Sequence, residues 1–189
     1  MSQLQLLQQA LNPGDVVDTP DWVAQDMVAW FSPTGKILEP CRGNDAIYKY
    51  LPGAEWCEIA MGRDFFQWTT QVDWIISNPP FGREMFGDWL EHSFEVAKNI
   101  VYLYPPGFFF SAGSRLERCR KDGWLRHIRF YGNGSALGFP MGNPIAAMHF
   151  IRGYYGTSSW SWYNEQMYGS NTTSQNKEMK DGNVLDRNA

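Results

Sequence analysis

The stretch VDWIISNPPF, residues 72–81, joins an apolar run to a turn that holds two consecutive prolines. Valine, isoleucine and tryptophan favour a buried strand over residues 72–77. Pro79 and Pro80 have no N–H to donate, so the strand is expected to end just before them. In a sheet built from alternating strands and helices, ligands bind beyond the carboxyl ends of the strands. The turn at Asn78 is therefore the first place to look for chemistry.

Outward from this turn, the pattern alternates. Thr19 is expected to cap a helix that has Pro20 at its first position. The last two strands have no helix between them and are expected to pair antiparallel. This order predicts an α/β fold with a mostly parallel, doubly wound sheet that ends in an antiparallel strand pair. Apolar spacing and breakers predict helices over residues 21–31, 46–51, 83–98 and 114–121, and strands over 36–39, 54–59, 72–77, 100–104, 125–131 and 145–151.

Length and composition bound the possible classes. The 189 residues suit one catalytic domain, expected over residues 1–152, with 153–189 as an extension that ends in a polar tail. No apolar run is long enough for a membrane span, and the start lacks a secretory signal, so a cytoplasmic protein is expected. The three cysteines form no C-x-x-C pair, which argues against a disulfide framework and against a bound metal.

The turn Asn78-Pro79-Pro80-Phe81 resembles the hallmark of the amino-methyltransferases, a strand followed by N-P-P-Y or N-P-P-F. The resemblance implies a Rossmann-like class I methyltransferase in which these four residues are catalytic. The asparagine oxygen and the following proline carbonyl would accept hydrogen bonds from an exocyclic amine, whose lone pair is otherwise delocalised into its ring. The phenylalanine would stack on an extruded base.

Further motifs of the same family follow in order and imply S-adenosyl-L-methionine as cofactor. Residues 18–20 resemble the motif at the methionine moiety, and 37–44 resemble the loop that wraps the cofactor. Glu58 matches the acid that receives the ribose hydroxyls, and Asp64-Phe65 matches the pair at the adenine ring. The residues expected to bind the cofactor are Thr19, Pro20, Glu39, Pro40, Cys41, Gly43, Glu58, Asp64, Phe65 and Asn78.

Two departures from the family pattern stand out. The cofactor loop of this family commonly ends Gly-x-Gly, whereas the second glycine is here Asp45. Only a short segment separates the second and third strands, so the sheet edge near Asp64 is expected to be trimmed. The motif order resembles the γ arrangement of small, phage-type DNA adenine-N6 methyltransferases, including those of restriction-modification, but a separate reading domain has no room after residue 152.

The resemblance implies methylation of the N6 amine of adenine in DNA. RNA adenine or guanine methylation is the first alternative, because a compact chain suits a substrate recognised by shape. A silent nucleic-acid-binding subunit of the same fold is the second, and Asp45 favours it. The net charge of −4 is unusual for a nucleic-acid binder, but residues 111–131 carry an excess of positive charge. The nucleic-acid contacts are expected at Arg115, Arg118, Lys121 and Phe139.

Overall fold

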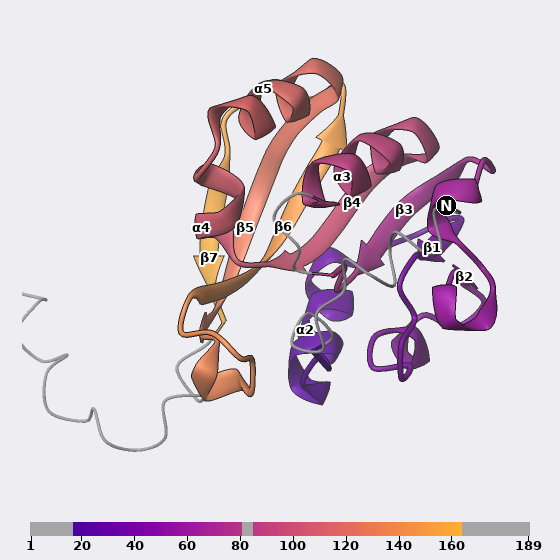
Figure 1. Cartoon of the computed structure of the whole chain (residues 1–189), viewed down its shortest axis with the longest axis horizontal. Helices are drawn as coiled ribbons and strands as arrows, with labels where there is room; N and C mark the ends of the chain where they lie inside the picture. The colour runs from indigo at the N-terminus through magenta and orange to yellow at the C-terminus, as the bar shows by residue number, and fades with distance from the viewer. Residues whose placement is uncertain (1–16, 81–84, 164–189) are drawn as a thin grey trace, which may run out of the picture.

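The computed structural model describes residues 17–80 and 85–163, which form one seven-stranded sheet with helices on both faces (Figure 1). The strand order across the sheet is β2-β1-β3-β4-β6-β5-β7. The strands are β1 (Ile37–Glu39), β2 (Glu55–Trp56), β3 (Val72–Ser77), β4 (Ala97–Tyr104), β5 (Gly123–Asn133), β6 (Pro144–Arg152) and β7 (Ser159–Trp162).

Strands β2, β1, β3 and β4 run parallel, and β6 then pairs antiparallel with both β4 and β5. The predicted mostly parallel sheet with an antiparallel pair near the C-terminus is therefore confirmed. The centre of the sheet is fully buried, as in β4, where Ile100 to Tyr104 have no exposed area. Such continuous apolar runs are typical of strands that are covered on both faces.

Helices cover the two faces unequally. On one face lies α2 (Asp21–Phe31), whose Phe31 ring contacts His149 of β6. On the other lie α3 (Met85–Val96), α4 (Pro106–Phe110) and α5 (Gly113–Asp122). Phe109 of α4 packs edge to face on Phe150, the next residue of β6, and successive strand residues point to opposite faces. The sheet is therefore a doubly wound sheet with one helix on its thinner side.

The trimmed edge predicted near Asp64 is present. Two short 3-10 turns, Ile59–Met61 and Phe65–Gln67, replace the helix that would connect β2 to β3. The helix predicted over residues 46–51 is also reduced, to the 3-10 turn Tyr48–Tyr50. Leu51 and Pro52 stop it early, because a proline cannot donate the next helical hydrogen bond. Short connections leave the β1 side of the sheet open, and the cavity described below lies there.

A buried ion pair holds α2 against the sheet. Both nitrogens of the Arg129 fork on β5 donate to the Asp26 carboxylate of α2, and the Tyr131 hydroxyl donates to Asp26 Oδ2 at 2.9 Å. Arg129 is 6% exposed, so the pair is shielded from water. Breaking one partner of such a pair leaves an uncompensated buried charge, which costs roughly 3–5 kcal/mol. The anchor holds the middle of α2, the helix that follows the cavity segment at residues 17–19, against the sheet.

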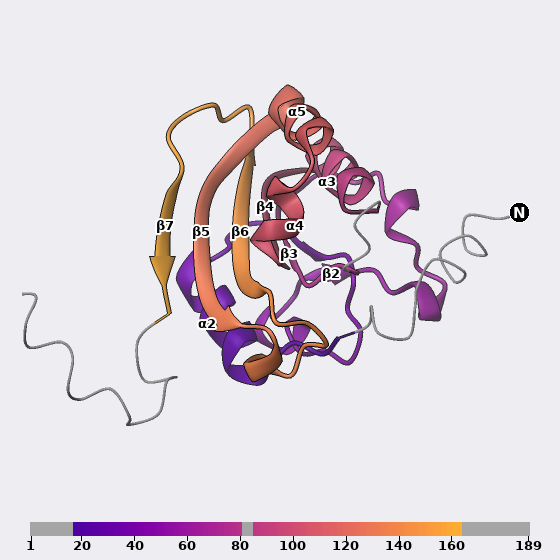
Figure 2. The ribbon, with the colours of Figure 1, turned by 60° about the vertical axis from the view of Figure 1, so that its left-hand side comes forward.

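Two elements were missed by the sequence interpretation. The short helix α4 follows β4 directly, and β7 pairs parallel with β5. The sheet thus continues beyond Arg152, where the catalytic domain was expected to end, and the extension contributes its outermost strand (Figure 2). Within residues 17–80 and 85–163, no helix is both long enough and apolar enough to cross a membrane.

Candidate active site

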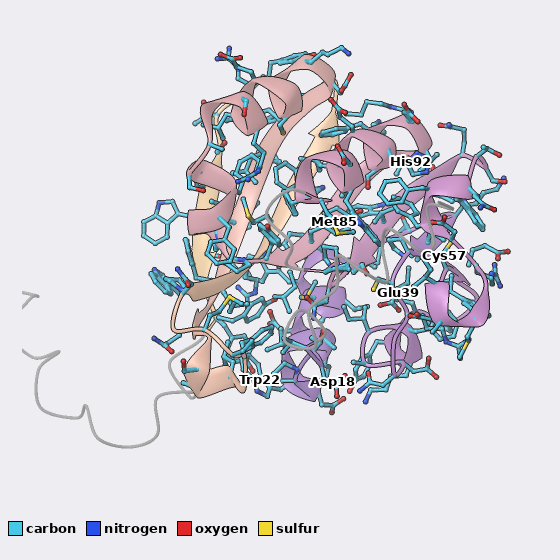
Figure 3. The ribbon with its side chains drawn as sticks, in the orientation of Figure 1. Asp18, Trp22, Glu39, Cys57, Met85 and His92 are labelled. Carbon is cyan, nitrogen blue, oxygen red and sulfur yellow. The ribbon has the colours of Figure 1, made fainter. Side chains whose placement is uncertain are left out.

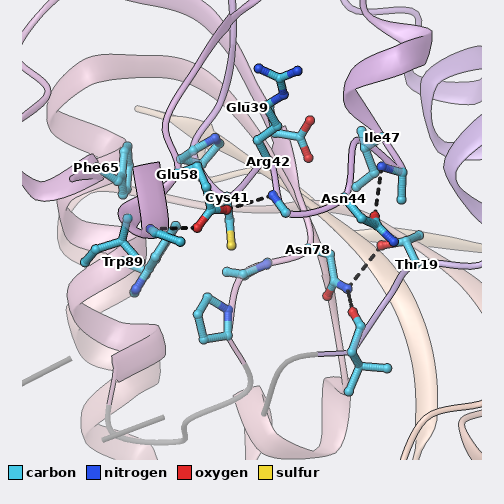
Figure 4. A pocket seen from close by; sticks show the side chains of 18 of the residues that line it. Thr19, Glu39, Cys41, Arg42, Asn44, Ile47, Glu58, Phe65, Asn78 and Trp89 are labelled. Carbon is cyan, nitrogen blue, oxygen red and sulfur yellow. Dashed lines mark hydrogen bonds between the residues drawn. The ribbon is translucent and has the colours of Figure 1, made fainter. Parts of the chain in front are cut away.

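A cavity of about 360 Å³ opens beyond the carboxyl ends of β1 and β3 (Figure 4). Its wall comes from five places: the segment before α2, the loop after β1, the turns after β2, the start of the turn after β3, and helix α3. Glu39 closes its inner end and lies beside Cys57, whose N–H donates to the Glu39 carbonyl at 2.8 Å (Figure 3). The cavity is therefore at the strand edge where the fold places ligands.

The Asn78 amide has a fixed orientation in this cavity. Its Nδ2 donates to the Val17 carbonyl at 2.9 Å and to Thr19 Oγ1 at 3.1 Å (Figure 4). A backbone carbonyl can only accept, so the amide nitrogen must face Val17 and the amide oxygen must face the other way. Asn78 Oδ1 is buried and has no hydrogen-bond partner among the described residues. The site thus presents a desolvated acceptor that a ligand N–H could satisfy.

Thr19 does not cap the helix as expected. Pro20 occupies the N-cap position of α2 without a side-chain hydrogen bond, and the helix begins at Asp21. The Thr19 side chain instead turns toward the cavity, is 7% exposed and accepts the bond from Asn78. The cap prediction was wrong because the threonine had a partner 59 residues away. Thr19 also lines the cavity, and its contact with the cofactor stays a prediction.

Glu39 is a carboxyl group in an apolar setting. It is 1% exposed, it lines the cavity, and its Oε2 has no partner among the described residues. Burial raises the pKa of Glu39 to about 9, and the negative charge of Asp45 adds to the effect. The side chain is therefore protonated at neutral pH while the cavity holds no cation.

The loop after β1 is held by the acid at the end of the second strand. Glu58 Oε2 accepts from the Gly43 N–H at 2.8 Å, and Oε1 accepts from the Ala60 N–H at 3.0 Å. Both backbone segments line the cavity, so Glu58 joins them across its rim.

Cys41 also lines the cavity, and burial raises the pKa of its thiol to about 12. The thiol is thus protonated and a poor nucleophile.

Asp45 takes the conformation that a glycine would supply. Its φ is 71°, in the left-handed region that side chains rarely adopt, although aspartate tolerates it better than most. Its carboxylate pairs with Arg42, and the Arg42 guanidinium also lies 4.4 Å from the ring centre of Tyr48 and 4.5 Å from that of Trp56. Asp45 does not line the cavity. The departure from Gly-x-Gly therefore leaves the loop bent and the cavity open.

Aromatic rings form the opposite end of the cavity. Phe65 stacks on Trp89 of α3, with ring centres 4.9 Å apart and planes inclined by 30°. Asp64 caps the turn that carries Phe65, because one of its carboxylate oxygens accepts from the Phe66 N–H at 3.0 Å. Trp89 Nε1 is buried without a partner in the described part of the chain. This end is suited to a flat ring with polar edges.

The structure brings most of the predicted cofactor residues to this one cavity. Pro20 is the exception, because it faces a shallow neighbouring hollow with Leu137, Gly138 and Pro140. Sequence reasoning did not name several wall residues, and only the apolar stripe of α3 offered a signal for Trp89. The predicted residues on the wall are Thr19, Glu39, Pro40, Cys41, Gly43, Glu58, Asp64, Phe65, Asn78, Pro79 and Pro80, and the additional ones include Val17, Arg42, Asn44, Ile47, Phe66 and Trp89.

The predicted nucleic-acid contacts are not brought together. The Arg115 side chain donates to the Phe108 carbonyl, and Phe139 is 3% exposed within the hydrophobic core. Lys121 is exposed, but it lies at the far end of α5, away from the cavity (Figure 1). The pairing of Gly123 with Arg152 places that end of α5 near the start of β4. Phe81 and the side chain of Arg118 lie outside the described residues.

Comparisons with solved structures identify the fold. The chain resembles a protein assigned as a class I S-adenosylmethionine-dependent methyltransferase from Listeria monocytogenes, with a TM-score of 0.57 and 13% identity over 84% of this chain and 69% of that chain. It has the class I methyltransferase fold. No profile of a known protein family matches the sequence, and no curated protein matches it.

Two other structures with this methyltransferase fold carry different functional assignments. A chain assigned as a modification subunit of a type I restriction enzyme from Vibrio vulnificus matches with a TM-score of 0.55 and 13% identity over 86% of this chain and 50% of that chain. A chain assigned as an RNA methyltransferase from Pyrococcus horikoshii matches with a TM-score of 0.51 and 14% identity over 79% of this chain and 96% of that chain. The present chain spans about half of the restriction-modification chains it matches.

A metal centre has no ligand set in this part of the chain. Residues 17–80 and 85–163 contain no group of three or more histidine, cysteine, aspartate or glutamate side chains placed to hold an ion. Cys57 and Cys119 are buried and unpaired thiols, as is usual for structural cysteines.

Proposed function

We propose that the protein transfers the methyl group of S-adenosyl-L-methionine to the N6 amine of adenine in DNA. The observation that carries the proposal is the Asn78 amide, whose oxygen is buried, unpartnered and oriented by its two bonds to Val17 and Thr19. An acceptor held in this way matches the need of an exocyclic amine, which must give up conjugation before its lone pair can attack. The motif Asn78 to Phe81 and the class I fold support the same reaction.

The cavity fits the proposed cofactor at both ends. The buried Glu39 carboxyl and Thr19 would receive the cationic methionine part, and Glu58 would receive the ribose hydroxyls. The adenine ring would lie against Phe65 and Trp89. One carboxylate oxygen of Asp64 accepts from the Phe66 N–H, and the other would accept from the adenine amine. The unpartnered atoms Glu39 Oε2 and Trp89 Nε1 are an acceptor and a donor that such a molecule would satisfy.

The cofactor and the side chains of the protein would have different roles in the reaction. The cofactor supplies an electrophilic methyl group on a sulfonium. Asn78 Oδ1 and the Pro79 carbonyl accept the two N–H groups of the target amine, which favours a pyramidal nitrogen and stabilises the charge that develops on it. Pro79 is buried and rigid, so this carbonyl does not need to be ordered during the reaction. Phe81 would stack on the extruded base.

Analysis of the labelled products tests which polymer the protein methylates. The protein is incubated with S-adenosyl-L-methionine labelled in its methyl group and with unmethylated DNA, total RNA or protein, and the labelled nucleosides are then separated. We expect N6-methyladenine from DNA. Label found only in RNA would favour the alternative, an RNA methyltransferase. Tight cofactor binding by calorimetry with no transfer to any polymer would contradict the proposed reaction, and no binding would favour a silent subunit.

Thr19→Val is expected to lower the turnover number at saturating cofactor by about tenfold. Valine keeps the shape of the side chain but removes the acceptor of the Asn78 bond, so the amide loses one of its two anchors. Thr19→Ser keeps the hydroxyl and should restore most of the turnover. Cofactor affinity is measured in parallel by calorimetry, because Thr19 also lines the cavity. Equal turnover in all three proteins would show that Thr19 does not position the amide.

A further inference from the structure

The outer third of the sheet differs from the rest of the chain in charge. Residues 123–163, which form β5, β6, β7 and their connections, contain no aspartate or glutamate, although the chain has 20 acidic residues and a net charge of −4. Two exposed arginines lie in the same stretch, Arg126 and Arg152, whereas Arg129 is buried against Asp26. A region without carboxylates on an acidic protein repels a polyanion least, so it is where nucleic acid would approach.

Aromatic side chains are exposed on the outermost strand of this region. Trp160 is 66% exposed and Trp162 is 55% exposed, which is unusual for indole rings. Trp162 stacks on Phe130 of β5, with ring centres 4.8 Å apart and planes inclined by 29°, and Trp160 meets Trp162 edge to face at 6.3 Å. We name these three rings the outer aromatic row.

The row faces outward because of the strand register. Trp160 pairs with Ile128 and Trp162 with Phe130, whereas the alternate residues Ser159 and Ser161 bond to His127 on the opposite face. Both indoles therefore lie on the face that α4 and α5 cover further along the sheet. Figure 2 shows β7 as the outermost strand, and no helix of residues 17–80 or 85–163 lies outside it. Arg126 of β5 is exposed, but its Nη1 donates to Ser159 Oγ at 3.4 Å, on the face opposite the indoles.

We propose that the outer aromatic row binds unpaired bases of the nucleic-acid substrate several nucleotides away from the target nucleotide. The inference rests on the proposed function and names a polymer surface distinct from the contacts predicted on α5. Exposed aromatic rings bind single strands by base stacking with little sequence preference, and the strands that carry these rings have no carboxylate to repel phosphates. The strand order places β7 four strands from β3, roughly 19 Å at the usual strand spacing, a distance that several nucleotides of an unpaired strand would bridge.

The test separates stacking from charge. Fluorescence anisotropy, without cofactor, compares a labelled single-stranded DNA of about 16 nucleotides with a strand of equal length that carries abasic sites. The native protein should prefer the strand with bases. The double variant Trp160→Ala/Trp162→Ala should lose about tenfold in affinity for that strand and bind the abasic strand as before, and Trp160→Phe/Trp162→Phe should retain the preference.

Other outcomes overturn the proposal in distinguishable ways. Equal affinity of the native and alanine proteins for the strand with bases would exclude the row as a nucleic-acid surface, while methyl transfer by the same proteins would still report on the proposed reaction. If the native protein sediments as a dimer and the alanine variant as a monomer, and both bind DNA with equal affinity, the row would be assigned to contact between copies of the chain.

Discussion

Asn78→Ala is expected to lower the turnover of methyl transfer by about a hundredfold or more, with little change in cofactor affinity. The loss should fall on turnover because Asn78 Oδ1 is proposed to strengthen its hydrogen bond as charge develops on the target amine. Removing one preorganised polar group from other active sites has an effect of this size. The measurement is single-turnover methyl transfer at saturating cofactor and DNA, with cofactor binding followed separately by calorimetry.

A matched variant controls for lost stability. Asn99 on β4 also uses its amide twice, donating to the Asp73 carbonyl at 3.2 Å and contacting His149 at 3.2 Å, but it lies away from the cavity. Asn99→Ala removes the same atoms and should cost comparable stability with unchanged turnover. Near-normal turnover in Asn78→Ala, or an equal loss in both variants, would contradict the catalytic role of Asn78.

Glu39→Gln is expected to stabilise the free protein at alkaline pH and to weaken cofactor binding. The pKa of Glu39 is raised to about 9 from an ordinary value near 4.5, so unfolding between these values releases a proton. The free energy of unfolding therefore falls as pH rises through this window and levels off above it. At pH 8 the carboxyl lowers stability by an amount on the order of a few kcal/mol, which an uncharged side chain avoids.

The measurement is the melting temperature of both proteins from pH 5 to pH 9 without cofactor. The native protein should lose stability relative to Glu39→Gln as the pH rises, and the difference between them is the diagnostic quantity. Cofactor binding by the native protein should release up to one proton near pH 7, seen as a dependence of the binding enthalpy on the buffer, because a cation favours the ionised carboxylate. Parallel melting curves and no proton release would show that Glu39 is ionised in the free cavity.

The central sheet could be predicted because its signals are local. The strand Val72–Ser77 has the predicted bounds, and so does the helix Asp21–Phe31. The edge strand Ser159–Trp162 could not be predicted, since its sequence SWSW is short, stands among glycine and serine, and contains no buried residue. Its place in the sheet depends on pairing with β5, which no local pattern specifies.

The candidate site could likewise be predicted only in part. Motif residues such as Asn78 and Glu58 could be named because their types and order carry the resemblance. The bond from Asn78 to Thr19 could not, because it joins residues 59 positions apart and competes with a helix cap that the local sequence favours. Phe139 was misassigned for the opposite reason, since an aromatic residue in a glycine-rich loop gives no local sign that it is 3% exposed.

Asp45 bears on how distant members of this fold can be recognised. A sequence motif that requires glycine at that position rejects this chain, although the backbone of Asp45 has the φ of 71° that the turn needs. The physical requirement is tolerance of a positive dihedral angle, which glycine meets best and which asparagine and aspartate also meet. A search that scores each loop position by the dihedral angle its residue can accept would retain sequences of this kind and reject those with a β-branched residue at the bend.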